Sequence, residues 1–240
     1  MSREAVGPTR LVRVWDLPTR LFHWSLVVLV AIAWFTGEGE NGTASIHRYS
    51  GEVIAGLIVF RVVWGFIGGE HARFSDFAAG PSVVIAHVRN LYSKAPERSL
   101  GHNPLGGVAV FLLLLNVAGL VFTGLFSGGE NNSGPFAGLW GLQLSDAHET
   151  LFRILQALTV VHVLGVAVES WKAKDALVPA MITGVKRRGA SEPARDAGRA
   201  GLMALLVAAG MGIAVSAALI SAPPSTIQTT GLVHEDQEVH

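Results

Sequence analysis

The sequence predicts an all-α membrane protein that crosses the bilayer five times. Half of its 240 residues are hydrophobic and only 15% are charged, whereas a soluble domain carries about 25% charged residues. The apolar residues also form blocks long enough to span the hydrocarbon core of a bilayer. Five blocks meet this requirement: about 21–36, 49–69, 106–127, 149–169 and 200–221.

The basic residues predict how these helices are oriented. Fifteen of the eighteen Lys and Arg residues lie before the first block, between the second and third, or between the fourth and fifth. The other segments outside the membrane contain no basic residue: 37–46, 128–147 and 222–240. Because positively charged loops stay in the cytoplasm, we expect a cytoplasmic N-terminus and a C-terminus on the outer side.

The absence of cysteine narrows the possible chemistry. Disulfides, iron–sulfur clusters, zinc–thiolate sites and covalent haem attachment through C-x-x-C-H all require cysteine, and the chain has none. The formal net charge is zero, so no basic surface indicates a nucleic-acid partner. No small-residue cleavage site closely follows the first block, which predicts an anchor helix rather than a removed signal peptide.

The first predicted helix runs outward from the cytoplasm and carries one histidine near its start. Pro18 stands where a first-turn proline is tolerated, and His23 follows Arg20 by about one turn. No charged residue occurs between His23 and Phe35. His23 is therefore expected one turn inside the inner interface.

The second helix runs inward from the outer face, where His47 begins it. Gly51 and Arg61 share the face of His47 within helical tolerance. Arg61 is fourteen residues beyond His47, which puts it in the inner third of the bilayer. A charged side chain at that depth is costly and is by default a candidate functional residue.

The third helix presents a face of small and polar residues, Asn116, Gly119 and Thr123, at three- and four-residue steps. Small residues at this spacing allow another helix, or a flat macrocycle, to approach the backbone. Both interpretations fit the pattern. The link before this helix, 70–105, contains an amphipathic stretch that suits the membrane surface.

The fourth helix is expected over 145–171, with Ser145 or Asp146 as its N-terminal cap. It carries His148 and His162, fourteen residues apart. Fourteen steps at about 100° and 1.5 Å bring the second histidine within roughly 40° of the first and about 21 Å further along. One face of one helix therefore offers two imidazoles at two depths.

After the fourth helix we expect a loosely ordered basic segment over 172–199 and then a fifth helix without ligand-type side chains. It carries a small-residue stripe typical of close helix packing: Ala204, Ala208, Gly212 and Ser216. We also expect this helix to dock a partner's anchor helix. We divide the chain into four parts: a core over 1–185, a linker over 186–199, the extra helix over 200–221 and a polar outer tail over 222–240.

The four membrane histidines form two opposed pairs when they are placed at their depths. His47 and His148 both lie near the outer interface, and His23 and His162 both reach the inner level. Each pair is the ligand set of a six-coordinate bis-histidine haem iron, which has no open position and suits electron transfer. The two irons would lie roughly 20 Å apart along the membrane normal.

Arginines at matching depths could neutralise haem propionates. Arg20 and Arg61 lie at the inner level, and Arg48 lies at the outer level. Arg153 fits the outer level less well, because five residues after His148 is about 140° round the helix. The alternative for each membrane histidine is a simple polar bridge between helices.

Five further histidines lie outside the membrane blocks and are expected to be solvated: His71, His87, His102, His234 and His240. Glu169 lies two turns beyond His162 on the same face. It either marks the membrane boundary or serves a proton path to quinone.

Three patches of this sequence resemble the bacterial cytochrome b561 / Ni,Fe-hydrogenase B-type cytochrome subunit family. They are V-W-D-x-P-x-R-L-F-H-W at 14–24, I-H-R-Y-S-G followed by R-V-V-W-G at 46–65, and A-H-E-T-L with a histidine fourteen residues on at 147–162. The resemblance implies a four-helix transmembrane bundle with two b-type haems in a bacterial inner membrane. It carries the family's ligands onto four residues: His23, His47, His148 and His162.

We therefore expect a di-haem membrane cytochrome b of a respiratory chain, with Gly51 and Gly119 beside the haems. The resemblance implies electron transfer between the quinone pool and a partner such as a hydrogenase, a dehydrogenase or cytochrome c. One alternative is a stand-alone oxidoreductase that reduces quinone with a small outer-side donor. Others are a non-redox anchor and a metal transporter, which would be colourless when purified.

Overall fold

The computed structural model describes residues 9–38, 42–90, 99–128, 133–190, 192 and 194–222. Within these residues it contains five helices long and apolar enough to cross a membrane, as predicted. They are α1 (Leu17–Thr36), α2 (Ala44–Ile67), α5 (Pro104–Phe126), α6 (Ser145–Lys172) and α8 (Leu202–Ser221). Of the tail predicted over 222–240, residues 223–240, with His234 and His240, lie outside the described residues.

Side-chain caps define where two of these helices begin. Asp16 accepts a hydrogen bond from the Thr19 backbone N–H at 2.8 Å, and Asn103 accepts one from Gly106 at 2.6 Å. Each cap satisfies an N–H group that has no partner inside the helix. The predicted cap of α6 is wrong, because Leu144 precedes the helix without a side-chain hydrogen bond. Ser145 instead donates to the Gly128 carbonyl.

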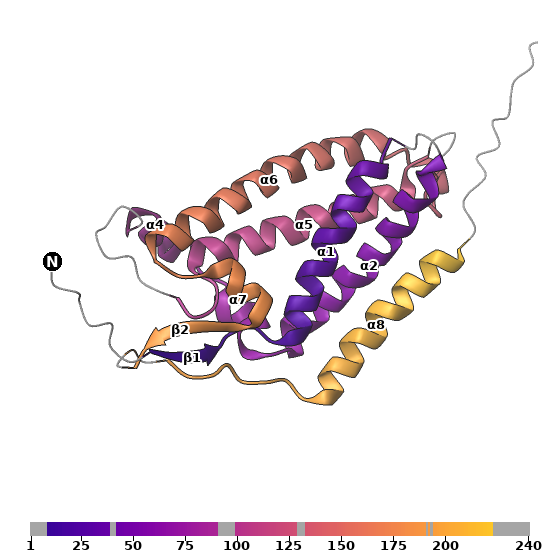
Figure 1. The fold of residues 1–240 in the computed structure, drawn as a ribbon. Helices are drawn as coiled ribbons and strands as arrows, with labels where there is room; N and C mark the ends of the chain where they lie inside the picture. Colours follow the sequence, from indigo (N-terminus) through magenta and orange to yellow (C-terminus); the bar gives the residue numbers. More distant parts are fainter. Residues whose placement is uncertain are drawn as a thin grey trace, which may run out of the picture.

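The first four long helices form two pairs that pack together. Figure 1 shows α1 beside α2 and α5 beside α6, and α2 also packs on α5. The buried centre of this bundle consists of aliphatic side chains from three helices: Ile54, Ile58, Val117 and Leu155. Long apolar surfaces elsewhere on the helices face outward, as expected where lipid rather than water surrounds them.

The fifth helix, α8, runs along α2 on the side away from α5 and α6 (Figure 1). A Cβ added at Gly56 would overlap Ser216 Oγ and the Gly212 carbonyl, so the two backbones approach as closely as glycine permits. Ala208 is fully buried in the same interface, beside Trp64. The predicted small-residue stripe therefore does pack closely, but on α2 of its own chain. It is not free to receive a partner's anchor helix.

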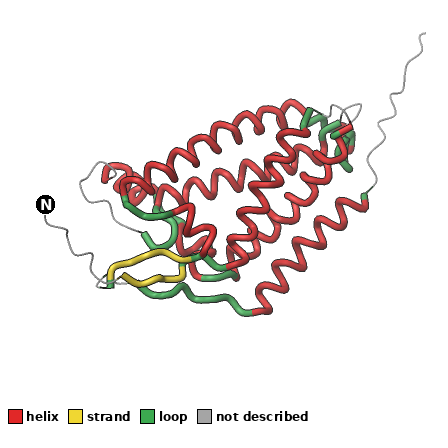
Figure 2. Tube along the Cα trace, in the orientation of Figure 1, coloured by secondary structure: helices red, strands yellow, loops and turns green. Residues whose placement is uncertain are grey.

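A small folded cap covers the end of the bundle where α1 begins and α2 ends. β1 (Thr9–Arg13) pairs antiparallel with β2 (Val185–Gly189), next to α7 (Leu177–Thr183). Figure 2 shows these strands at one end of the helical bundle. Short helices α3 (Phe74–Phe77) and α4 (Pro81–Asn90) and the 3-10 turn Glu70–Ala72 lie in the link between α2 and α5.

The cap corrects the prediction that 172–199 is loosely ordered. The Asp175 carboxylate lies 3.1 Å from Lys186 Nζ and 3.0 Å from Arg188 Nη2, and all three side chains are buried. Further along, the Ala197 N–H donates to the Arg13 carbonyl. Two of the basic residues that suggested a solvated linker, Lys186 and Arg188, are therefore paired with an acid inside the cap. Strand β2 also crosses the boundary predicted at 185 between the core and the linker.

Candidate haem-binding sites

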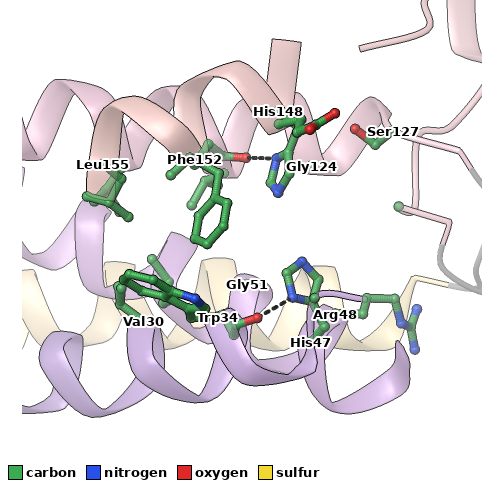
Figure 3. A pocket seen from close by; sticks show the side chains of 18 of the residues that line it. Val30, Trp34, His47, Arg48, Gly51, Gly124, Ser127, His148, Phe152 and Leu155 are labelled. Carbon is green, nitrogen blue, oxygen red and sulfur yellow. Dashed lines mark hydrogen bonds between the residues drawn. The ribbon is translucent and has the colours of Figure 1, made fainter. Parts of the chain in front are cut away.

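A cavity of about 620 Å³ opens between α1, α2, α5 and α6, at the end of the bundle where α1 ends and α2 begins. His47 of α2 and His148 of α6 both line it, with ring centroids 6.1 Å apart and planes at 77°. Figure 3 shows the two imidazoles facing each other across the cavity, with Trp34 and Phe152 beside them. The structure therefore brings together the predicted outer pair.

Hydrogen bonds fix the orientation of both outer imidazoles. His47 Nδ1 lies 2.8 Å from the Ala33 carbonyl oxygen, and His148 Nδ1 lies 3.0 Å from the Leu120 carbonyl oxygen. A carbonyl can only accept, so each Nδ1 carries the proton and each Nε2 keeps its lone pair. A metal-ligating histidine usually donates its other ring N–H to a carbonyl or carboxylate in this way.

These residues fit a haem. A metal held about 2 Å from both nitrogens places the two ring centres about 6 Å apart, close to the 6.1 Å observed. The cavity volume lies in the range of about 300–1,000 Å³ typical of ligand pockets. Both features agree with a flat macrocycle held between two axial imidazoles.

Three glycines make room around the outer imidazoles, and the sequence predicted one of them. A Cβ at Gly124 would lie 3.1 Å from His148 Cε1, and a Cβ at Gly37 would lie 3.5 Å from the His47 ring. Gly51, as predicted, lines the cavity and has no neighbouring atom within 4 Å of an added Cβ. Gly119 instead faces Leu151 Cδ1 at 3.1 Å, so it serves the packing of α5 on α6.

Charged side chains also line the outer cavity. Arg48 lies 3.6 Å from the Glu52 carboxylate, four residues further along α2. Arg153 is mostly exposed and pairs with Glu149 on its own helix. Sequence reasoning missed Glu52, although an acid one turn after Arg48 in an otherwise apolar helix is a recognisable signal.

The inner histidines, His23 of α1 and His162 of α6, lie close enough to interact electrostatically. His23 Nδ1 is buried and has no hydrogen-bond partner among the residues that the structure describes. The two residues stand on helices that run in opposite directions, and their pairing at the inner level stays a prediction.

The predicted inner arginines have different surroundings. Arg61 is only 3% exposed, and its guanidinium lies 4.9 Å above the Phe74 ring. Its Nη1 has no hydrogen-bond partner within the described part of the chain. Arg20 Nη1 donates to the Thr183 carbonyl at 2.6 Å, so this arginine ties α1 to the end of α7.

The prediction of solvated histidines is wrong for His71 and His102. The His102 ring packs 4.7 Å from Trp15 and 4.5 Å from Phe77, measured between ring centroids. Burial, strengthened by the positive charge of Arg61, lowers the pKa of His102 to about 3. His71 Nδ1 lies 2.7 Å from an Asp76 carboxylate oxygen. The aromatic cover comes from other segments, so local polarity could not reveal it.

Comparison with known proteins identifies the family. The prokaryotic cytochrome b561 profile matches residues 14–184. A probable Ni/Fe-hydrogenase B-type cytochrome subunit of Azotobacter chroococcum mcd 1 is 30% identical over 190 residues, which cover 68% of this chain and 78% of that protein. The protein of the same name from Bradyrhizobium diazoefficiens is 26% identical over 223 residues, covering 78% and 90%.

A more distant relative is the probable Ni/Fe-hydrogenase 1 B-type cytochrome subunit of Escherichia coli K12, which is 22% identical over 211 residues, covering 72% of this chain and 89% of that protein. No solved structure shows significant similarity. The family match and the five apolar helices indicate a protein of the bacterial inner membrane. The chain belongs to the prokaryotic cytochrome b561 family, whose members transfer electrons in the membrane through b-type haem.

Proposed function

We propose that this chain relays electrons across the inner membrane through two bis-histidine b-type haems. His47 and His148 would hold the outer haem, and His23 and His162 the inner one. The observation that carries the proposal is the outer pair, whose Nδ1 atoms are hydrogen-bonded to carbonyls while the rings face each other 6.1 Å apart. Two axial imidazoles leave no open position on iron, which favours electron transfer over oxygen chemistry.

Helix α6 supplies one ligand to each site and so sets their separation. His148 and His162 are fourteen residues apart on this helix, which is about 21 Å along its axis. Two haems at that separation would divide the path of an electron across the bilayer into shorter transfer steps.

The arginines supply positive charge for the carboxylates of the haems. Arg48 lines the outer cavity, and Arg61 has a buried, unpartnered nitrogen at the inner level among the described residues. Gly51 leaves the α2 backbone open to the macrocycle. Arg20 and Gly119 are engaged with Thr183 and Leu151, so we assign them to packing.

We infer a hydrogenase-type enzyme as the redox partner and quinone as the other electron carrier. Several relatives are named as Ni/Fe-hydrogenase cytochrome subunits, and this name supports a hydrogenase as the partner. With N-terminus inside and C-terminus outside, the partner would dock on the outer side and quinone would react near the inner haem, beside Arg61. A purified chain that reduces quinone from a small donor without any partner would favour a stand-alone oxidoreductase.

The transporter alternative is less well supported. Within the described residues, no group of three or more His, Cys, Asp or Glu side chains gathers to hold a metal ion. The membrane histidines instead occur in pairs, which is the protein donor set of a six-coordinate haem iron.

The decisive experiment counts haem in the purified chain by the pyridine haemochrome method. We expect two haems per wild-type chain and one in each of the variants His23→Ala, His47→Ala, His148→Ala and His162→Ala. The control variant His87→Ala, on the short helix α4, should keep both. Two full haems in all four ligand variants would contradict the assignment.

A further inference from the structure

Glu52 is a buried acid inside the membrane that the relay described above does not use. Its side chain is 2% exposed, and it lines the same cavity as His47 and His148. Neither carboxylate oxygen has a hydrogen-bond partner among the described residues. An ionised carboxylate without hydrogen bonds is costly in such an environment, and an acid within a membrane helix is by default a functional candidate.

Two opposing effects act on the Glu52 carboxylate. On α2, the Arg48 guanidinium lies 3.6 Å away and favours the charged form, whereas burial favours the neutral form. From α8, Ser216 Oγ donates to the Glu52 backbone carbonyl, not to its side chain. Neither α8 nor α5 contains an ionisable residue.

The remaining ionisable groups on the cavity wall are less suited to exchange a proton there. Glu38, beyond the end of α1, is exposed, and Glu149 and Arg153 on α6 pair with each other at the exposed mouth. Each histidine has its Nδ1 hydrogen-bonded to a carbonyl. Glu52 is therefore the group whose charge can respond to the cavity's contents.

We propose that Glu52 takes up one proton when one electron reaches the outer site and releases it when the electron leaves. This inference rests on the proposed function of that site. The added electron lowers the positive charge in the cavity by one, which removes part of the attraction that kept the carboxylate ionised. The proton comes from the outer aqueous phase and forms one O–H bond on the carboxylate. The electron comes from the redox partner on the outer side or from the inner haem.

The proposal predicts that the midpoint potential of the outer haem depends on pH. For a one-electron couple, a tenfold change in proton concentration shifts the potential by at most about 59 mV, and the potential should fall as pH rises. The measurement is a redox titration of the purified chain, followed by its visible spectrum at several pH values. The outer haem is identified as the one missing from His47→Ala.

Matched variants separate Glu52 from other acids. Glu52→Gln should keep the outer haem but lose the pH-dependent slope, and Glu52→Asp should retain the slope. The control Asp146→Asn, an exposed acid at the outer start of α6, should leave the slope unchanged. A wild-type outer haem with a pH-independent potential would overturn the inference, as would a Glu52→Gln protein with the wild-type slope.

A second measurement detects the proton directly. The infrared difference spectrum between reduced and oxidised protein should contain a protonated-carboxyl band that disappears in Glu52→Gln and shifts in Glu52→Asp. The same band, unaltered in both variants, would exclude Glu52 as its source. A chain that binds no haem would overturn the proposed function together with this inference, whereas two haems with a pH-independent outer potential would overturn this inference alone.

Discussion

At the scale of single residues, the outer imidazoles owe their positions to small neighbours and to carbonyl oxygens. Gly124 lies directly beside the His148 ring, and Leu120, one turn earlier on α5, provides the carbonyl that orients it. Thr123 Oγ1 lies 3.1 Å from the same Nδ1. The ring is thus held by one short stretch of α5.

Enlarging Gly124 should disturb the outer site selectively. Even one Cβ would lie 3.1 Å from His148 Cε1, so the two γ carbons of Val must displace the ring. We expect Gly124→Val to bind about one haem per chain instead of two, measured by pyridine haemochrome. The control Gly165→Ala, also in a long helix but with open space around it, should bind both. Full haem content in Gly124→Val would show that the ring position is not critical.

The buried His102 predicts a pH-dependent stability. Its pKa is lowered from 6.5 to about 3 in the folded protein, so between these values the unfolded chain binds more protons. The free energy of unfolding that neutral, buried His102 contributes is fully present above pH 6.5. It is lost as pH falls toward 3, by at most about 1.4 kcal/mol per pH unit. Thermal unfolding in detergent should show that His102→Phe, which preserves the aromatic contacts, is less sensitive to acid. Equal acid sensitivity in both proteins would contradict this.

At the scale of elements, α2 is the helix on which the rest is assembled. It packs on α1, α5 and α8, and it carries His47, Glu52 and Arg61. Two of its glycines face different neighbours: Gly51 lines the cavity, and Gly56 contacts α8. The same helix therefore forms one wall of the site and the surface on which α8 packs.

The α2–α8 contact should be intolerant of any added side-chain atom. Gly56→Ala would place its Cβ against Ser216 Oγ and the Gly212 backbone, and overpacking of this kind costs about 1–3 kcal/mol. We expect a lower unfolding temperature in detergent. Gly210→Ala, on α8 with no atom within 4 Å of its added Cβ, should be neutral or slightly stabilising, because alanine favours helix over glycine. Equal unfolding temperatures for the two variants would contradict the close packing.

At the scale of the whole molecule, the orientation in the membrane would decide which of the two proposed haems faces which proposed partner. The basic residues predict that the cap made of β1, β2 and α7 lies in the cytoplasm. Because the chain has no cysteine, single cysteines report the side of the membrane without background. Gln143→Cys should react with an impermeant thiol reagent in intact cells, and Ser82→Cys only after the membrane is opened. The reverse labelling pattern would mean that the site of His47 and His148 faces the cytoplasm, contrary to the predicted orientation.

Most of the transmembrane architecture could be predicted, because each membrane helix is specified locally by an apolar stretch. The separation of two histidines followed from the same regularity: the fixed helical rise converts sequence separation into distance along the axis, so His148 and His162 had to lie at two levels of α6. The cap could not be predicted in this way. Its strands lie more than 170 residues apart, and Lys186 and Arg188 are recognisable as buried only beside Asp175.

The sequence by itself determined the five membrane helices and the separation of His148 and His162 along α6, because hydrophobic length and helical rise are local properties. Only the tertiary structure decided which side chains meet. It turned Nδ1 of His47 and His148 toward carbonyls, directed Gly119 to packing, covered His102 with Trp15, and buried Glu52 beside the outer cavity. These outcomes depend on how neighbouring helices rotate and approach one another, which is settled by contacts between segments distant in the chain.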